Sequence, residues 1–162
     1  MAAPLLDADN AAFLVSGLSI VAASRDDAMV PSIARVSGCR VSADRYTVTV
    51  YVPENQAGRL VADVRASGRI AVACNRASTH RSLQLKAEDA RVRPATPEEV
   101  AAVPAYVDAF ARDIVPMGHT LEQAQTIFRF RDGDLVAIDF TPSAAFEQTP
   151  GPKAGTPLAA PR

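Results

Sequence analysis

Residues 46–74 read YTVTVYVPENQAGRLVADVRASGRIAVAC and combine two strand patterns with one helix pattern. In residues 46–52, Val alternates with Thr and Tyr, which predicts a strand with one apolar face. Residues 54–67 carry apolar side chains at helical spacing, and Gly68 is suited to end that helix. Residues 69–74 follow as a short apolar run. This stretch therefore predicts a strand–helix–strand unit.

The residues before this unit predict one helix and two strands. Asp7 or Asp9 can cap a short helix that ends near Val15. Residues 18–27 form an apolar run that closes in two aspartates, which predicts a strand entering a turn. Residues 29–42 predict a second strand, bent near its glycine.

The residues after the unit predict a further strand and a helix. Residues 81–94 have the mixed polarity of one longer strand. Thr96, Pro97 and Glu99 have the order of a helical capping box. Pro104 falls inside the apolar pattern of that helix, which predicts a kink or two short helices.

A second helical piece is expected over residues 120–125, followed by a β-hairpin. IFRFR (127–131) and DLVAIDF (134–140) are the expected strands. Asp132-Gly133 between them has the composition of a tight hairpin turn.

The C-terminal residues differ in composition from the rest. Residues 141–162 contain five of the 12 prolines, and a tail of this kind is expected to form no core element. We therefore predict one domain over residues 1–140. Its sequential strands and few covering helices favour a mainly β (α+β) antiparallel barrel. A doubly wound parallel sheet is disfavoured, because strands and helices do not alternate at either end.

Composition and charge exclude several classes of partner. The 162 residues carry a formal net charge of −1, which gives no general attraction to nucleic acid or anionic membranes. Aromatic residues make up only 6%, too few for stacking platforms along a nucleic acid. The apolar run at residues 11–23 is too short and interrupted to span a bilayer, and the first ten residues lack a signal-peptide pattern. We expect a cytoplasmic protein.

The residues used most often in catalysis form no recognisable motif. Cys39 and Cys74 are expected to be free, buried thiols, although a disulfide between them stays open. His80 and His119 lie far apart, so no metal site is predicted. No nucleophile elbow, phosphate-binding P-loop or dinucleotide-binding glycine motif occurs. Catalytic residues therefore stay unassigned.

One segment has the composition of a phosphate site. Residues 76–86, RASTHRSLQLK, bring together basic side chains, which attract phosphate, and hydroxyls, which bond its remaining oxygens. Strand alternation places Gln84 and Lys86 on one face and Arg81 on the other. The alternative is an edge strand with solvated charges and no ligand. The candidate contacts are Ser78, Thr79, His80, Arg81, Gln84 and Lys86.

The sequence leaves more than one role possible for Arg35 and for His80. Arg35 lies in an otherwise apolar strand pattern, so it must face solvent, a partner or a ligand. His80 is either a proton donor or an ordinary polar surface residue.

Four pieces of the chain are distinctive together: IVAASRDD (20–27), VPSIARVSGCRV (30–41), VTVYVPENQAGRLVADVRASGRIAVAC (48–74) and STHRSLQLKAEDARV (78–92). They resemble the pyridoxamine phosphate oxidase-like family of FMN-binding split β-barrels. The resemblance covers residues 13–93. It implies an antiparallel split β-barrel with flanking helices and a homodimer that binds two FMN molecules, each through both subunits.

The resemblance also assigns residues to the cofactor. Arg35 matches the basic position on the second strand, and Thr49 and Tyr51 lie in the strand whose backbone lines the flavin ring. Gln84 matches a glutamine facing the flavin, while Arg81 and Lys86 lie in the segment suited to the phosphate.

Departures from the family pattern argue against oxidation of pyridoxamine phosphate itself. The family's Arg-x-x-x-Leu-Lys pattern is absent after Arg35, and residues 53–56 (PENQ) replace its Ser-Arg-Lys. The resemblance implies an FMN-dependent oxidoreductase acting on a small organic substrate or a reduced nicotinamide. The alternative is a non-catalytic protein that binds flavin, deazaflavin or haem.

Overall fold

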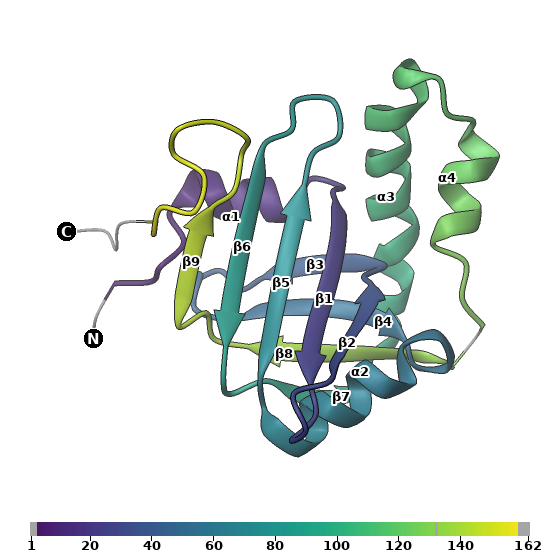
Figure 1. The fold of residues 1–162 in the computed structure, drawn as a ribbon. Helices are drawn as coiled ribbons and strands as arrows, with labels where there is room; N and C mark the ends of the chain where they lie inside the picture. The colour runs from purple at the N-terminus through teal and green to yellow at the C-terminus, as the bar shows by residue number, and fades with distance from the viewer. Residues whose placement is uncertain (1–2, 132, 159–162) are drawn as a thin grey trace.

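Two antiparallel sheets form the body of the molecule (Figure 1). The structure is a computed structural model that describes residues 3–131 and 133–158. The five-stranded sheet has the spatial order β2 (Pro31–Arg35), β1 (Ser19–Arg25), β5 (Ile70–Asn75), β6 (Ser82–Ala87) and β9 (Ala144–Glu147). The four-stranded sheet has the order β3 (Gly38–Val41), β4 (Val48–Pro53), β8 (Leu135–Phe140) and β7 (Arg91–Pro94). The predicted α+β class and split-barrel architecture are confirmed.

The main core lies between the two sheets. Val48, Val50 and Val52 of β4 are fully buried there, together with Leu83 and Leu85 of β6. Side chains at alternate positions must point to opposite faces of a strand. The intervening residues of β4 therefore face a second, smaller cluster beneath the helices.

Helix α2 (Glu54–Ser67) connects β4 of one sheet to β5 of the other. Its predicted apolar stripe is buried, and Gly68 ends it in the left-handed conformation with φ of +67°. The helix packs against β1 and β2, where Ser32 Oγ donates a hydrogen bond of 2.6 Å to the Asp63 carboxylate. The predicted strand–helix–strand unit thus joins the two sheets.

The remaining helices flank the barrel. Asp7 caps α1 (Ala8–Leu14), as predicted. The Thr96–Glu99 capping box opens α3 (Pro97–Ile114), which continues through Pro104 as one helix and not as two. A 3₁₀ turn, η1 (Val115–Met117), leads to α4 (Leu121–Ile127), which lies beside α3 (Figure 1). No helix among the described residues is long and apolar enough to cross a membrane. The cytoplasmic location stays a prediction.

Two segments predicted as single strands are each divided between the sheets. Residues 29–42 form β2 and β3, and residues 81–94 form β6 and β7. In the first, the chain crosses between sheets at residues 36–37. There the Val36 amide donates to Ile20 and the Ser37 amide donates to Tyr51, so adjacent residues bond to different sheets.

The predicted hairpin is wrong in its first strand (127–131), whereas its second strand (134–140) is confirmed as β8. Residues 127–131 contain the end of α4 followed by irregular chain. Phe128 packs edge-on against Phe110 of α3, with the ring centres 5.0 Å apart, and this contact holds the segment beside α3. Asp132, half of the predicted turn, lies outside the described residues.

The expectation that residues from Thr141 onward form no core element is also wrong. β9 pairs with β6 along Leu83–Lys86, and Ala145 of β9 is buried. The chain then folds back so that Pro157 bridges Phe146. Pro161 lies outside the described residues.

Two glycines give opposite predictions for stability. A Cβ on Gly17, whose φ is +81°, would lie 2.5 Å from the Ala109 Cβ, whereas Gly58 has no neighbour within 4 Å. Gly17→Ala is expected to lower the free energy of unfolding by about 2–4 kcal/mol through backbone strain and overlap. Gly58→Ala, within α2, is expected to raise it by about 0.5–1 kcal/mol. Urea denaturation measures both free energies of unfolding, and equal effects would contradict the close approach of Gly17 to Ala109 of α3.

Candidate functional site

The outer face of the five-stranded sheet carries three of the predicted site residues. Strand register places Arg35, Val21, Ala73, Gln84 and Phe146 in one row across the sheet. The neighbouring row on the same face consists of Ile33, Ala23, Ala71, Lys86 and Ala144. In Figure 1 this sheet is at the front, with the helices behind and beside it.

An open hollow of about 590 Å³ lies on this face. Its floor includes Ala23, Ala71 and Ala144, whose small side chains leave the backbone accessible to a flat ligand. Arg25 and Lys86 also line the hollow. The site thus combines a small-residue floor with positive charge.

Three cations on this face lack acidic partners, whereas Arg69, which also lines the hollow, lies 3.7 Å from the carboxylate of Glu88. Arg25 donates to the Asp26 carbonyl at 3.0 Å, and Arg35 donates to Ser19 Oγ at 3.2 Å. Lys86 Nζ lies 5.2 Å from the centre of the Phe146 ring. Among residues 3–131 and 133–158, none of these three cations forms an ion pair. Uncompensated cations beside an apolar floor favour an anionic ligand.

The structure separates the turn at residues 78–81 from that face. Ser78 hydrogen-bonds to Asp113 of α3 through both its hydroxyl and its amide. The Arg81 guanidinium forms an ion pair of 2.6 Å with Asp9 and lies 4.2 Å from the centre of the Phe13 ring.

Thr79 and His80 are exposed in the same turn, where His80 has a φ of +59°. Thr79 Oγ1 accepts a hydrogen bond of 3.4 Å from the amide of Arg81. Ser78 and Arg81 therefore hold the β5–β6 turn against α3 and α1. The structure does not bring the four residues of this turn together with Gln84 and Lys86.

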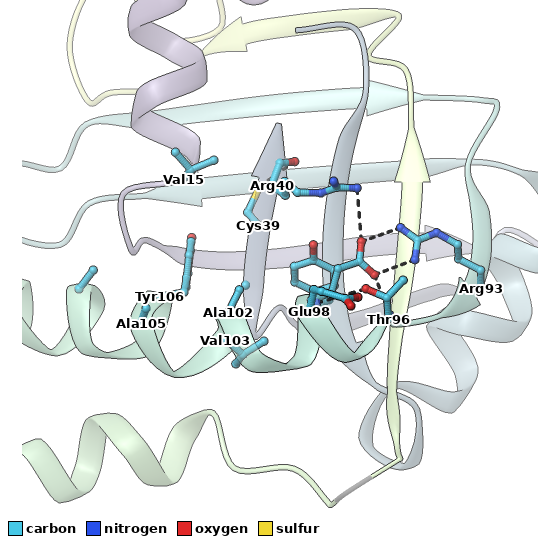
Figure 2. A pocket seen from close by; sticks show the side chains of 14 residues that line it. Val15, Cys39, Arg40, Arg93, Thr96, Glu98, Ala102, Val103, Ala105 and Tyr106 are labelled. Carbon is cyan, nitrogen blue, oxygen red and sulfur yellow. Dashed lines mark hydrogen bonds and ion pairs between the residues drawn. The ribbon is translucent and has the colours of Figure 1, made fainter. Parts of the chain in front are cut away.

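The second polar cluster lies between α3 and the four-stranded sheet. Register places Arg40, Thr49 and Asp139 side by side on this face, with Tyr51 and Arg93 on the next row. Arg40, Tyr51 and Arg93 border a groove with a volume of about 650 Å³, which Figure 2 shows.

Glu99 is the centre of this cluster, because it contacts Arg93, Arg40 and the Thr96 amide. Arg93 binds its carboxylate through both terminal nitrogens, at 2.7 and 2.8 Å, and binds Asp139 through Nε at 2.6 Å. The Thr96 amide donates to Glu99 at 2.9 Å, and Arg40 lies 3.3 Å away. Hydrogen bonds from Arg93, opposed in part by burial, lower the pKa of Glu99 to about 2.

Thr49 and Tyr51 belong to this second cluster and not to the outer sheet face. Thr49 is buried and donates to Asp139 at 2.7 Å. Tyr51 is also buried, and burial, followed by the neighbouring charge of Glu99, raises its pKa to about 12. A Cβ on Gly38 would lie 3.1 Å from the Tyr51 ring, so the absent side chain allows the ring to lie against β3.

The cluster around Glu99 contains residues that the sequence reasoning missed. Arg40, Arg93 and Asp139 each interrupt a predicted strand with a charge, which was the available signal. The same argument had been applied only to Arg35. Glu99 was identified as a helix-capping residue, but its ion pair with Arg40 joins two elements, β3 and α3, that are distant in sequence.

Comparisons with known proteins identify the fold. No family model matches the chain, and no curated protein matches it. Among solved structures, HupZ from Group A Streptococcus is similar with a TM-score of 0.56 and 17% identity, over 93% of this chain and 100% of that chain. A putative pyridoxamine 5'-phosphate oxidase from Lactobacillus delbrueckii has a TM-score of 0.52 and 12% identity, over 87% and 93%. An F420 reductase has a TM-score of 0.53 and 12% identity, over 83% and 93%.

These similarities place the chain in the split-barrel fold of the pyridoxamine 5'-phosphate oxidase-like proteins. At such identities the likeness concerns the fold alone, and function has to be argued from the sites.

The Glu99 cluster predicts a pH-dependent contribution to stability. Because the pKa of Glu99 falls from 4.5 to about 2 on folding, its contribution is full above pH 4.5 and is lost as the pH falls toward 2. Glu99→Gln is expected to cost on the order of 3 kcal/mol at pH 7. The difference in the free energy of unfolding between the variant and the wild type should become smaller as the pH falls toward 2.

Urea denaturation at several pH values measures this difference. Glu98→Gln, an exposed neighbour on the same helical turn, is the control and should change stability little. A Glu99→Gln difference that stays constant from pH 7 to pH 2.5 would contradict the ionised cluster.

Proposed function

We propose that the protein binds FMN on the outer face of the five-stranded sheet and works as an oxidoreductase. The supporting observation is the set of three cations, Arg25, Arg35 and Lys86, that have no acidic partner among the described residues. Arg25 and Lys86 border a floor of small residues, and Arg35 lies on the neighbouring row of the same face. The fold is shared with an F420 reductase and a putative pyridoxamine 5'-phosphate oxidase.

The residues of this face fit the chemistry of FMN. Alanine side chains on adjacent strands provide a flat floor for an aromatic ring system. Gln84 is half-buried on the same face, and its amide can both donate to and accept from polar ring atoms. Lys86 and Arg25 supply positive charge for the phosphate, and Arg35 lies on the row of Gln84. Ser78 and Arg81, which already bind acidic residues, are not needed.

A second copy of the chain completes the site in this proposal. The hollow is open on the side away from the sheet, and Ile33 beside it is 69% exposed. Met29, which lines the hollow, is 65% exposed. A homodimer that covers these apolar side chains would also close the hollow and exclude water from the ligand.

When bound, FMN supplies reversible hydride and electron transfer. The chain's own residues bind and orient the group. The substrate class is a small organic molecule or a reduced nicotinamide that reaches the ring from the dimer cleft. No side chain is assigned a catalytic proton transfer.

Phosphate recognition is tested by comparing FMN with riboflavin, which lacks the phosphate. Lys86→Gln should weaken FMN binding about 10- to 100-fold through the lost charge-assisted bond, and riboflavin binding much less. Arg112→Gln removes the same charge from an exposed position on α3 and should leave both affinities unchanged. Flavin fluorescence titration provides the measurement. Equal losses for FMN and riboflavin would reject the role of Lys86.

The visible spectrum of the purified protein separates FMN from its alternatives. A yellow protein that is bleached by dithionite or by a reduced nicotinamide supports the proposal. Binding of F420 in place of FMN would indicate a deazaflavin protein, the alternative favoured by the similarity to an F420 reductase. A Soret band without flavin absorption would replace the proposal with haem binding.

The dimer is tested at its proposed apolar edge. Ile33→Glu places a charge on the exposed outer face of β2 and should convert the dimer to a monomer and weaken FMN at least tenfold. Leu121→Glu, at a position on α4 that is 52% exposed, is the matched control and should do neither. Light scattering during size-exclusion chromatography measures the mass. A wild-type monomer that binds FMN tightly would contradict the shared site.

A further inference from the structure

The groove beneath α3 is a second candidate binding site. It has a volume of about 650 Å³ and is bordered by α3, β3, β4 and the end of α1, elements that the proposed flavin site does not use (Figure 2). Its walls are apolar along most of their length, with Val15, Ala102 and Ala105 among them. Charged side chains gather at the other end.

Small side chains keep the groove open. Ala102, Ala105 and Ala109 lie at the groove along one face of α3, with Val103 and Cys39 also contributing to its lining. Ala102 and Ala105 are exposed, so their small size is not required by packing in the core. The groove therefore offers accessible apolar surface to a small molecule.

At the charged end, Arg93 and Glu99 use their hydrogen-bonding groups on one another and on neighbouring residues. All three guanidinium nitrogens of Arg93 bind Glu99 or Asp139. Both oxygens of Glu99 accept hydrogen bonds from Arg93, and one also accepts from the Thr96 amide. Together with Arg40, these groups carry two positive and two negative charges and form a fixed base for the groove.

Arg40 differs from Arg93 in this respect. Its one ion pair among the described residues is the 3.3 Å contact with Glu99, whose oxygens are already bound by Arg93. The Arg40 side chain is 59% exposed and lines the groove. A guanidinium carries five N–H donors, so Arg40 retains donors that can bind an incoming acceptor.

We propose that this groove binds a small organic monocarboxylate, with its carboxylate on Arg40 and its apolar body against the alanines of α3. A cation is disfavoured because both oxygens of Glu99 already accept hydrogen bonds from Arg93. A dianion such as a phosphate ester is disfavoured because the exposed Glu98, which has no ion pair among the described residues, lies at the same end of the groove. The Tyr51 hydroxyl at the groove interacts with Glu99 and Arg40, which helps to fix these two side chains at the charged end.

Hexanoate is a suitable probe, with 1-hexanol as its uncharged counterpart. Titration of the full-length, ¹⁵N-labelled protein with hexanoate should shift the amide resonances of Arg40, Ala102 and Ala105 in a saturable manner. Arg40→Gln should weaken hexanoate about 10- to 100-fold and should leave hexanol unchanged. Arg91→Gln removes a charge from an exposed position on the same sheet and should change neither affinity more than twofold.

A second pair of variants tests the location. Ala105→Leu fills the groove and should abolish hexanoate binding, whereas Ala101→Leu, exposed on the same helix but not lining the groove, should preserve it. Lys86→Gln should not change the affinity for hexanoate, so the test of the groove does not depend on the proposed flavin site. Equal binding of hexanol and hexanoate, or retention of hexanoate by Arg40→Gln or Ala105→Leu, would overturn the proposal.

Discussion

The alternation of side chains along β4 and β6 determines where the two polar sites of this protein lie. Its valines must fill the core between the sheets, so Thr49 and Tyr51 must face α3. The same rule on β6 buries Leu83 and Leu85 and turns Gln84 and Lys86 to the outer face of the other sheet. A one-residue shift in either strand would exchange core and site residues.

Charge compensation distinguishes the two sites. Beneath α3, carboxylates accompany the arginines, and the buried Glu99 is stable as an anion because Arg93 binds it in a forked geometry. On the outer sheet face, Lys86 and Arg35 have no carboxylate partner among the described residues. Exposed, uncompensated cations contribute little to folding, so these side chains are available to the ligand proposed for that face.

Local patterns in the sequence were sufficient for the strand–helix–strand unit and for the caps at Asp7 and Thr96, because each depends on neighbouring residues. They failed where the chain passes between sheets, since the Ser37 amide bonds to Tyr51 and no local pattern contains that partner. The faces of Gln84 and Lys86 followed from alternation. Alternation could not predict the partner of Arg81, because Asp9 lies 72 residues away in the chain.

The most direct measurement is a crystal structure of the protein grown with FMN. The account predicts two copies related by twofold symmetry, with the phosphate within hydrogen-bonding distance of Lys86 Nζ and the ring over Ala23 and Ala71. Flavin bound in the groove beneath α3, or on a face remote from the contact between copies, would contradict it.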